Sequence, residues 1–371
     1  MGKEQINARQ LFILVLFFEL GSALVVGLGG GAKQDAWLAV LVAMIGGIIL
    51  FLIYYRLYQY YPDIPLTEYL ELILGKILGR LIALLYILYF LYISSRVLRD
   101  FGEFLGAIAY METPTLFINT LMIVTIAYAV YKGFEVIART GELFFVLLYL
   151  LAISGFILIS AAGLIDVKNV KPILEQGWKP VFREVFTSTL YFPFGEMVVF
   201  LMLLPHLNKP KKAKRTVIFA MLLSGINLAI TMAVNVAVLG PDTFDRSTFP
   251  LLATIQKIRV ANFLERLDVF FMITLVLGGY FKISLFFYSA LIGTARLFHI
   301  EDYRKLIYPL GLVTLLLSLT IASNYTEHIK EGVEIVTVYL HLPLQVIVPT
   351  SLLVIASVRS RRQKKLQSST T

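Results

Sequence analysis

Three isolated charged residues, Glu19, Glu196 and Lys282, each lie near the middle of an apolar run long enough to cross a lipid bilayer. Each is the one charge in its run, over residues 10–30, 185–208 and 269–295 respectively. A charge at mid-membrane costs about 2.5–3.5 kcal/mol on insertion scales, so it normally faces a cavity or a charged partner. Two carboxyl groups and one ammonium group could form an ion pair, hold a proton or bind a charged ligand.

The composition requires that these charges be positioned by membrane-spanning elements. Of the 371 residues, 58% are hydrophobic and 15% are charged, whereas soluble domains contain about 25% charged residues. The absence of cysteine excludes disulfides, thiolate metal sites and cysteine nucleophiles. The net charge of +9 is explained by Lys and Arg in cytoplasmic loops, so no nucleic-acid partner is predicted.

Ten apolar segments reach the roughly 20 residues that a membrane-spanning helix needs. They are roughly 10–30, 36–56, 81–110, 114–131, 143–164, 185–205, 216–239, 267–294, 306–323 and 335–358. The first continues past its glycines without a small-residue cleavage pattern, so we interpret it as the first mature helix and not as a signal peptide. The sequence therefore predicts an all-α integral membrane protein with a single transmembrane domain over 1–371.

The distribution of Lys and Arg predicts the orientation of these helices. Alternate loops and both termini on one side hold 20 of the 33 Lys and Arg residues, and the loops of the other side hold ten. The positive-inside rule therefore places both termini in the cytoplasm. On that side, 56–80 is either an interfacial helix or a solvated loop. The basic tail 359–371 is predicted to be disordered and to lie against anionic lipid.

Two of the ten segments contain sequences that interrupt a helix. The first carries Glu19-Leu20-Gly21-Ser22 at its midpoint, and the sixth carries Phe192-Pro193-Phe194-Gly195-Glu196. Proline removes a backbone donor and glycine favours unwinding, and such breaks occur at membrane depth where they line a cavity or the protein interior. The alternative is a simple packing kink.

The positions of the two breaks, first and sixth of ten, indicate a five-helix unit that repeats. We predict repeat 1 over about 10–164, repeat 2 over about 185–323, and an extra helix over about 335–358. In transporters built on inverted repeats, the ends of such half-helices surround a central ligand. Their N–H groups favour a carboxylate and their carbonyl groups favour an ammonium group, so an amino acid fits both.

The isolated charges have more than one possible arrangement. Lys282 could pair with Glu19 or with Glu196, which leaves the other carboxyl group protonated or free to meet a ligand amine. The alternative is a static ion pair that only fixes helix packing. In the third helix, Arg96, Arg99, Asp100 and Glu103 share one face, where Arg96–Asp100 and Arg99–Glu103 could pair. That face belongs either to an outer ion or proton pathway or to the polar end of the helix at headgroup level.

Other chemistries have no matching pattern. The four histidines lack metal-ligand spacing, and the sequence contains neither a phosphate-binding glycine loop with its lysine nor a Gly-x-Ser-x-Gly turn. We therefore predict no enzyme activity, no metal and no cofactor.

Several short motifs in order along the whole chain resemble one known family. They are Gln10, Leu20-Gly21-Ser22, Asp35-Ala36-Trp37, Thr113-Pro114 and Phe192-Pro193-Phe194-Gly195-Glu196. The chain resembles the B-subunit permeases of the spore germination protein family, within the amino acid–polyamine–organocation superfamily. The resemblance implies a LeuT-like fold of ten helices in the inner membrane of a bacterial spore. It also implies a nutrient germinant receptor with two other subunits, one with a large cytosolic region and one a lipoprotein.

The same resemblance implies a small nutrient, an amino acid in the first instance, bound at the broken helices. Carried onto this chain, the resemblance points to Gly21, Ser22, Pro193, Gly195 and Glu196. With their neighbours Leu20, Ala23 and Tyr191, these are the predicted binding residues. Glu196 would meet the ligand amine, and Glu19, Lys282, Arg96 and Asp100 would balance charge or conduct an ion. Lys282 could replace the Na⁺ that this fold often binds. Three competing interpretations are a proton-coupled amino acid transporter, a scaffold without a ligand site, and a membrane-embedded enzyme.

Overall fold

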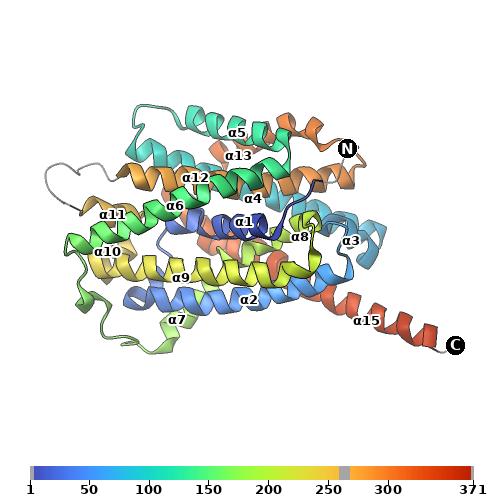
Figure 1. Ribbon diagram of the computed structural model, residues 1–371, viewed down its shortest axis with the longest axis horizontal. Coiled ribbons are helices and arrows are strands. Elements are labelled where there is room, and N and C mark those ends of the chain that lie inside the picture. Colours follow the sequence, from blue (N-terminus) through green and yellow to red (C-terminus); the bar gives the residue numbers. More distant parts are fainter. Residues whose placement is uncertain (1–3, 259–267, 369–371) are drawn as a thin grey trace.

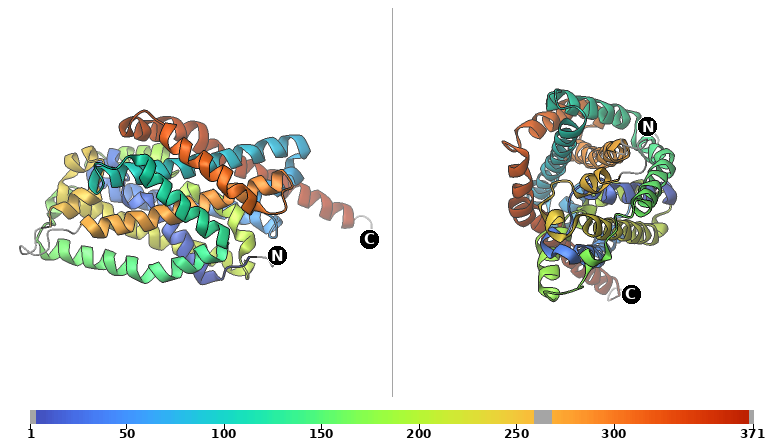
Figure 2. Two further views of the ribbon diagram at one scale, coloured as in Figure 1. Left: turned by 90° about the horizontal axis from the view of Figure 1, so that it is seen from above. Right: turned by 90° about the vertical axis from the view of Figure 1, so that its left-hand side faces the viewer.

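The computed structural model describes residues 4–258 and 268–368, and this part of the chain is almost entirely helical (Figure 1). The long helices lie side by side along the long axis of the molecule (Figures 1 and 2). The α-helices are α1 (Ala8–Leu20), α2 (Ala36–Tyr60), α3 (Leu66–Leu74), α4 (Lys76–Ile108), α5 (Thr115–Lys132), α6 (Phe134–Ala161), α7 (Trp178–Glu184), α8 (Phe200–Leu203), α9 (Ala213–Leu239), α10 (Pro241–Arg246), α11 (Pro250–Gln256), α12 (Asp268–Leu297), α13 (Ile307–Thr320), α14 (Tyr325–Glu331) and α15 (Val348–Ser368).

Short 3₁₀ and π segments connect or extend these helices. The 3₁₀ segments are η1 (Ser22–Leu24), η2 (Gly30–Asp35), η3 (Val167–Val170), η5 (Phe194–Val199), η6 (Leu204–His206), η7 (Pro210–Lys212) and η8 (Tyr303–Leu306). The π segments are η4 (Val185–Thr189) and η9 (Gly332–Ile347).

Among the described residues, eight helical stretches are long and apolar enough to cross a membrane. They are Gly30–Tyr60, Lys76–Ile108, Thr115–Lys132, Phe134–Ala161, Trp178–His206, Pro210–Leu239, Val269–Leu297 and Tyr325–Ser360. Each overlaps one predicted segment, which confirms the all-α membrane architecture. The two other predicted segments, 10–30 and 306–323, coincide with the shorter helices α1 and α13, of 13 and 14 residues.

The segment 56–80 contains a helix, which settles one of the alternatives left open by the sequence. α3 begins after Pro65 and ends at Gly75, whose φ of 84° lies in the region that favours glycine. Its apolar face, with Leu66, Tyr69 and Leu70, is buried, and it packs against α4 and α12. The loop interpretation of this segment is therefore wrong.

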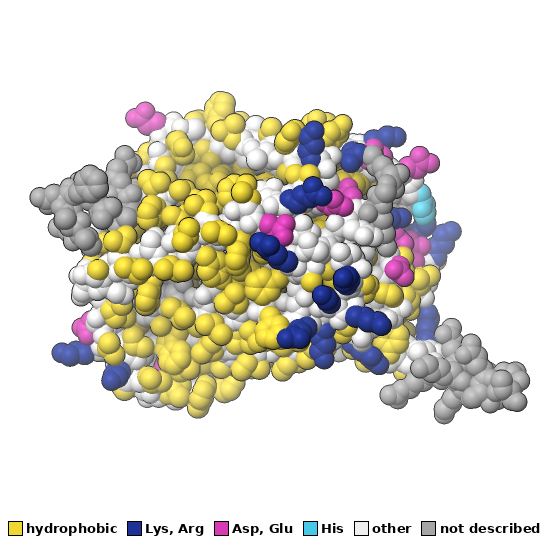
Figure 3. Space-filling model, viewed as in Figure 1, with side chains coloured by type: hydrophobic (Ala, Val, Ile, Leu, Met, Phe, Trp, Pro, Cys, Tyr) yellow, Lys and Arg dark blue, Asp and Glu magenta, His cyan; other side chains and the backbone are white. Residues whose placement is uncertain are grey.

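The chain ends marked N and C lie toward the same end of the bundle (Figures 1 and 2). On the face shown in Figure 3, Lys and Arg side chains gather toward that end and the opposite half is largely hydrophobic. This arrangement agrees with an even number of spans and with the positive-inside rule. The cytoplasmic location of that end stays a prediction.

The C-terminal segment differs from its prediction. α15 continues to Ser368, so the backbone is helical through most of the tail 359–371 for which disorder was predicted. Lys, Arg and Gln are good helix formers, and here they extend a helix that is already nucleated.

The first helix is interrupted at Gly21, as predicted. Gly21, with φ −16° and ψ −108°, departs from helical geometry and ends α1. Its N–H still donates to the Phe17 carbonyl at 2.9 Å. Beyond it the chain makes one 3₁₀ turn, η1, and then follows an irregular path to η2. The backbone beside Gly21 is therefore not part of a continuous helix.

The sixth helix is interrupted between η4 and η5, again as predicted. Pro193 in this turn has no N–H to donate, and the Gly195 N–H bonds back to the Leu190 carbonyl at 2.8 Å. A Cβ atom at Gly195 would collide with the side-chain oxygen of Gln345. A side chain at this position would therefore displace Gln345 from the break.

Candidate functional site

The candidate site centres on an ion pair between α12 and the second break. Lys282 Nζ lies 2.5 Å from Glu196 Oε2, and the two side chains are 0% and 2% exposed. The ammonium group also lies 4.2 Å from the ring centroid of Phe192 and 5.3 Å from that of Phe18. An opposite charge and two aromatic faces offset much of the free energy that Lys282 loses on leaving water. Of the two predicted partners of Lys282, the structure shows Glu196.

Glu19, in the last turn of α1, has a different partner. It is fully buried, its Oε2 accepts a hydrogen bond from the Ser224 hydroxyl of α9, and its Oε1 has no hydrogen-bond partner within the described residues. Sequence reasoning did not identify Ser224, although it shares a helical spacing with Asn227, Thr231 and Asn235 on α9. The two mid-membrane carboxyl groups therefore differ: Glu196 meets a cation and Glu19 meets a hydroxyl.

Two glycines bring the first break against α12, one turn before the ion pair. A Cβ atom at Gly278 would lie 2.9 Å from Gly21 Cα, closer than real Cβ contacts. In the other direction, a Cβ atom at Gly21 would lie 3.1 Å from the Gly278 carbonyl oxygen and 3.3 Å from Lys282 Cδ. Because the contact is between backbones, a shift of the broken segment of α1 acts directly on the part of α12 that carries Lys282.

The polar space at the first break is small. A cavity of about 10 Å³ is lined by Ser22, Asp100 and Gly279 together with apolar side chains, which is room for about one water molecule. The Ser22 hydroxyl is buried and has no hydrogen-bond partner in the part of the chain that the structure describes. The break therefore has polar groups but no space for a nutrient in this conformation.

A larger cavity of about 400 Å³ borders the same break. It lies between α1, α6, α9, α11 and α12, and its lining is mostly apolar. None of the described residues that line it is charged. The large cavity therefore lies on one side of α1 and the charged residues lie on the other.

The predicted binding residues occupy three different positions. Leu20 and Gly21 line the larger cavity and Ser22 lines the smaller one. The remaining five are buried and line neither of these two cavities: Ala23, Tyr191, Pro193, Gly195 and Glu196. Glu196, predicted to meet a ligand amine, is paired with Lys282 in this structure. The roles of these residues in ligand binding stay predictions.

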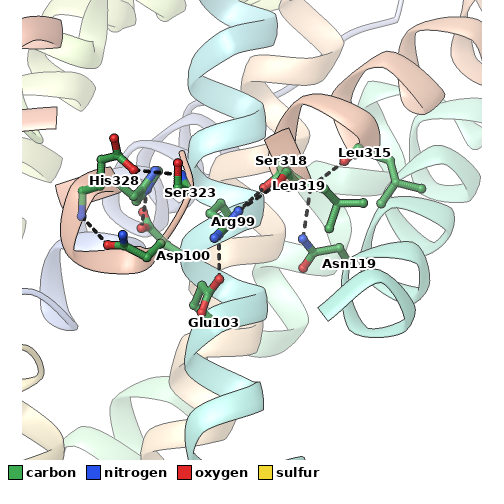
Figure 4. Close-up of polar contacts among 11 residues, drawn as sticks. Arg99, Asp100, Glu103, Asn119, Leu315, Ser318, Leu319, Ser323 and His328 are labelled. Atoms are coloured by element: carbon green, nitrogen blue, oxygen red, sulfur yellow. Dashed lines mark hydrogen bonds and ion pairs between the residues drawn. The ribbon is translucent and has the colours of Figure 1, made fainter. Parts of the chain in front are cut away.

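A second charged cluster connects α4 with α14 (Figure 4). The predicted pair Arg99–Glu103 is confirmed, with 2.7 Å between Arg99 Nε and Glu103 Oε1. The predicted pairing of Arg96 with Asp100 is wrong. Asp100 Oδ1 lies 2.9 Å from His328 Nε2, and Arg96 donates to the His328 carbonyl at 2.5 Å. His328 of α14, far away in the sequence, therefore contacts this face of α4 through both its imidazole ring and its backbone carbonyl.

The same cluster also caps α13. Arg99 donates to the carbonyls of Ser318 and Leu319 at 3.3 and 3.1 Å, which belong to the last turn of that helix and have no following helical N–H. Arg96 and Arg99 are 8% and 7% exposed. The arginines of this face of α4 are therefore turned into the protein, and whether the face lies at headgroup level or along an ion pathway stays a prediction.

Buried tyrosines support the second break through the final span. Pro349 has no N–H, so carbonyls one turn before it are short of a donor. The Tyr86 hydroxyl donates to the Leu344 carbonyl at 2.6 Å, and the Tyr54 hydroxyl donates to the Gln345 carbonyl at 2.6 Å. The Gln345 side chain contacts the break and donates to the Tyr89 hydroxyl at 2.8 Å. Sequence reasoning missed this network, because a tyrosine in an apolar helix does not show which distant carbonyl its hydroxyl meets.

The architecture is that of the LeuT-fold transporters. The structure of MhsT in complex with L-phenylalanine superposes with a TM-score of 0.69, covering 95% of this chain and 89% of MhsT, at 15% identity. Mhp1, a nucleobase-cation-symport-1 family transporter in a closed conformation with bromovinylhydantoin, gives a TM-score of 0.66 over 89% of this chain and 75% of Mhp1, at 12% identity. Identities this low establish the fold alone.

The sequence defines the family within this fold class. A family model described as spore germination protein matches residues 5–326, and the chain belongs to that family. Spore germination protein KB of Bacillus subtilis (strain 168) is 48% identical over 365 residues, which is 98% of each chain. Spore germination protein YndE of the same organism is 25% identical over 333 residues, 90% of each chain. The predicted family is confirmed.

Proposed function

We propose that this chain is the nutrient-sensing membrane subunit of a spore germinant receptor, and that a small nutrient, an amino acid in the first instance, binds at the helix breaks. Family membership supports the role in germination. The fold supports a small-molecule site, since MhsT was solved with L-phenylalanine. We place the receptor in the inner membrane of a spore, with one partner subunit that has a large cytosolic region and one that is a lipoprotein.

The observation that carries the proposal is the closed polar space at the first break. Ser22 and Asp100 face a volume of about 10 Å³, far too small for an amino acid. A ligand can bind there only when η1 separates from α4 and α12. Since a ligand shifts a conformational equilibrium by its difference in affinity for the two states, binding would stabilise the open one. A sensor needs this link between binding and movement.

The contacts around this space suggest which groups would bind and which would transmit the change. Asp100 is the carboxylate that borders the space, so we assign the ligand amine to Asp100 and the ligand carboxylate to Ser22 and the adjacent backbone. Glu196 stays with Lys282. The contact between Gly21 and Gly278 would pass the displacement of α1 to α12 and then to the second break.

Spores that carry Asp100→Asn in place of the wild-type chain test this assignment. After common amino acids are screened on wild-type spores, the variant should need at least about tenfold more nutrient, because a charge-assisted hydrogen bond to the ligand is lost. Glu103→Gln, one turn along the same helix and bound to Arg99, is the matched control and should respond almost normally. Equal responses of the two variants, at equal protein levels, would remove Asp100 from the site.

Uptake in proteoliposomes separates sensing from transport. Ion flux triggered by the nutrient without its accumulation supports the receptor. Stoichiometric accumulation of nutrient driven by a proton gradient would instead identify an amino acid transporter, coupled through Glu19 or Glu196.

A further inference from the structure

We propose that the cavity of about 400 Å³ is a second ligand site, specific for an uncharged molecule with an apolar body and one amide-like group. The cavity lies between α6, at the periphery of the bundle (Figure 2), and the helices α1, α9, α11 and α12. Its size is in the range of small-molecule sites, which are mostly apolar with a few placed polar groups. It is separate from the closed polar space at Ser22 and Asp100.

The lining determines the charge of the ligand. Leu and Ile side chains of α6 and α9 and the phenyl rings of Phe17, Phe270 and Phe271 form most of the wall, and no described lining residue is charged. An ion that entered this cavity would lose its hydration without gaining a partner of opposite charge. The cavity therefore selects against carboxylates and ammonium groups, and so against amino acids.

One polar side chain in the wall has free hydrogen-bonding groups. The others are satisfied by near neighbours: Asn227 donates to the Tyr149 hydroxyl at 2.8 Å, Thr231 to the Asn227 carbonyl at 2.8 Å, and Thr274 to its own helix at 2.9 Å. Asn235 is fully buried, yet neither its Oδ1 nor its Nδ2 has a hydrogen-bond partner within the described residues. Leaving such groups unpaired in the interior is unfavourable.

The chemistry of Asn235 determines the polar group of the ligand. Its planar side chain presents one acceptor and one donor side by side. A ligand carboxamide presents the complementary donor and acceptor and can form two hydrogen bonds with it. A hydrocarbon chain of a lipid would fill the volume but would leave both groups unpaired. The geometry therefore favours a compact amide over an acyl chain.

Binding of benzamide to the purified protein in lipid nanodiscs tests the site, with empty nanodiscs as the blank. Benzoate and benzylammonium, which have the same ring and a charged group, are the matched ligands. We expect saturable binding of benzamide by calorimetry and at least tenfold weaker binding of the two ions. Absence of saturable benzamide binding, or equal binding of all three, would overturn the proposal. The result does not depend on germination or on nutrient binding at the helix breaks.

Two variants locate the binding. Asn235→Leu keeps the volume and removes both hydrogen-bonding groups, so benzamide affinity should fall about tenfold or more. Gly155→Leu adds a side chain to a lining position where a Cβ atom meets nothing within 4 Å, and it should abolish binding by filling the cavity. Ile157→Phe, on the exposed side of the same helix, is the control and should bind normally.

The pattern of variant effects distinguishes the occupants. Loss of binding in Gly155→Leu with full affinity in Asn235→Leu would show an apolar cavity without amide recognition, and would refute the proposed ligand class. Full affinity in Gly155→Leu would place the benzamide elsewhere and refute the site.

Discussion

The ion pair of Lys282 and Glu196, here called the centre, and the cavity of about 400 Å³ lie on two sides of Gly21. They differ in packing as much as in charge. At the centre, Lys282 and Glu196 are at most 2% exposed, and the adjacent polar space is about 10 Å³. On the cavity side, a space of about 400 Å³ has no charged residue among the described ones that line it. A buried ion needs a partner in direct contact, whereas an apolar wall beside a void loses only dispersion contacts. The interior of a membrane protein can therefore contain a void where its side chains are uncharged.

The comparison also separates two kinds of response. At the centre, any added volume or lost partner must be accommodated by movement of a helix. In the cavity, a ligand or a larger side chain can enter without moving its neighbours. Substitutions on the two sides of α1 should therefore change the free energy of unfolding by different amounts and in opposite directions.

The largest effect is expected at the ion pair. Lys282→Met leaves Glu196 buried without its cation and should destabilise the protein by about 3–5 kcal/mol. The double variant Lys282→Met/Glu196→Gln removes both charges and should recover most of that loss. Both changes in the free energy of unfolding are measured on purified protein in nanodiscs by tryptophan fluorescence. Equal stability of wild type and Lys282→Met would show that the pair does not hold the centre together.

The contact between the two glycines predicts the next largest effect. Gly278→Ala places a Cβ atom 2.9 Å from Gly21 Cα and should destabilise the protein by about 1–3 kcal/mol through overpacking. Gly279→Ala is the matched control, since its Cβ atom would meet its nearest neighbour at 3.6 Å. The same unfolding assay should rank the two neighbouring variants in that order. Identical curves would mean that α1 and α12 are not in backbone contact.

A smaller loss of stability is expected when a tyrosine that supports the second break is substituted. Tyr54→Phe removes the donor to the Gln345 carbonyl, which Pro349 leaves short of a helical N–H. The free energy of unfolding should fall by about 1–2 kcal/mol. Tyr55→Phe, at the next and only partly buried position, should change it by less. A reversed order would count against the role assigned to Tyr54.

The interruptions and the isolated charges could be predicted from the sequence because each depends on local chemistry. Proline lacks an N–H and glycine favours unwinding, so Pro193 and Gly195 together favour a break, and a lone charge such as Lys282 in an apolar run needs a partner. These features identified both breaks and limited Lys282 to two possible partners. The apolar runs predicted an all-α membrane protein with a repeated five-helix unit, and the LeuT-like fold was implied by the resemblance to the spore germination protein family.

The remaining contacts depend on which distant helices pack together. Asp100 and Arg96 are spaced for a helical pair, yet both bind His328, more than 200 residues away in the sequence. Ser224 and Asn235 are two of several uncharged polar residues on α9, and only the tertiary structure shows that one meets Glu19 and the other lines a cavity. Helical periodicity identifies a face of a helix but not the partner that covers it.

The smallest predicted effect has the opposite sign and tests the comparison most directly. Gly155→Ala, on the cavity side of α6, adds a methyl group where a Cβ atom meets nothing within 4 Å. Alanine restricts the unfolded chain and favours the helix, so the variant should be about 0.5–1 kcal/mol more stable than wild type. The same substitution at Gly278, in the dense centre, should destabilise the protein. If both variants shifted stability in the same direction, the difference in packing between the two sides of α1 would not control how the protein responds to added volume.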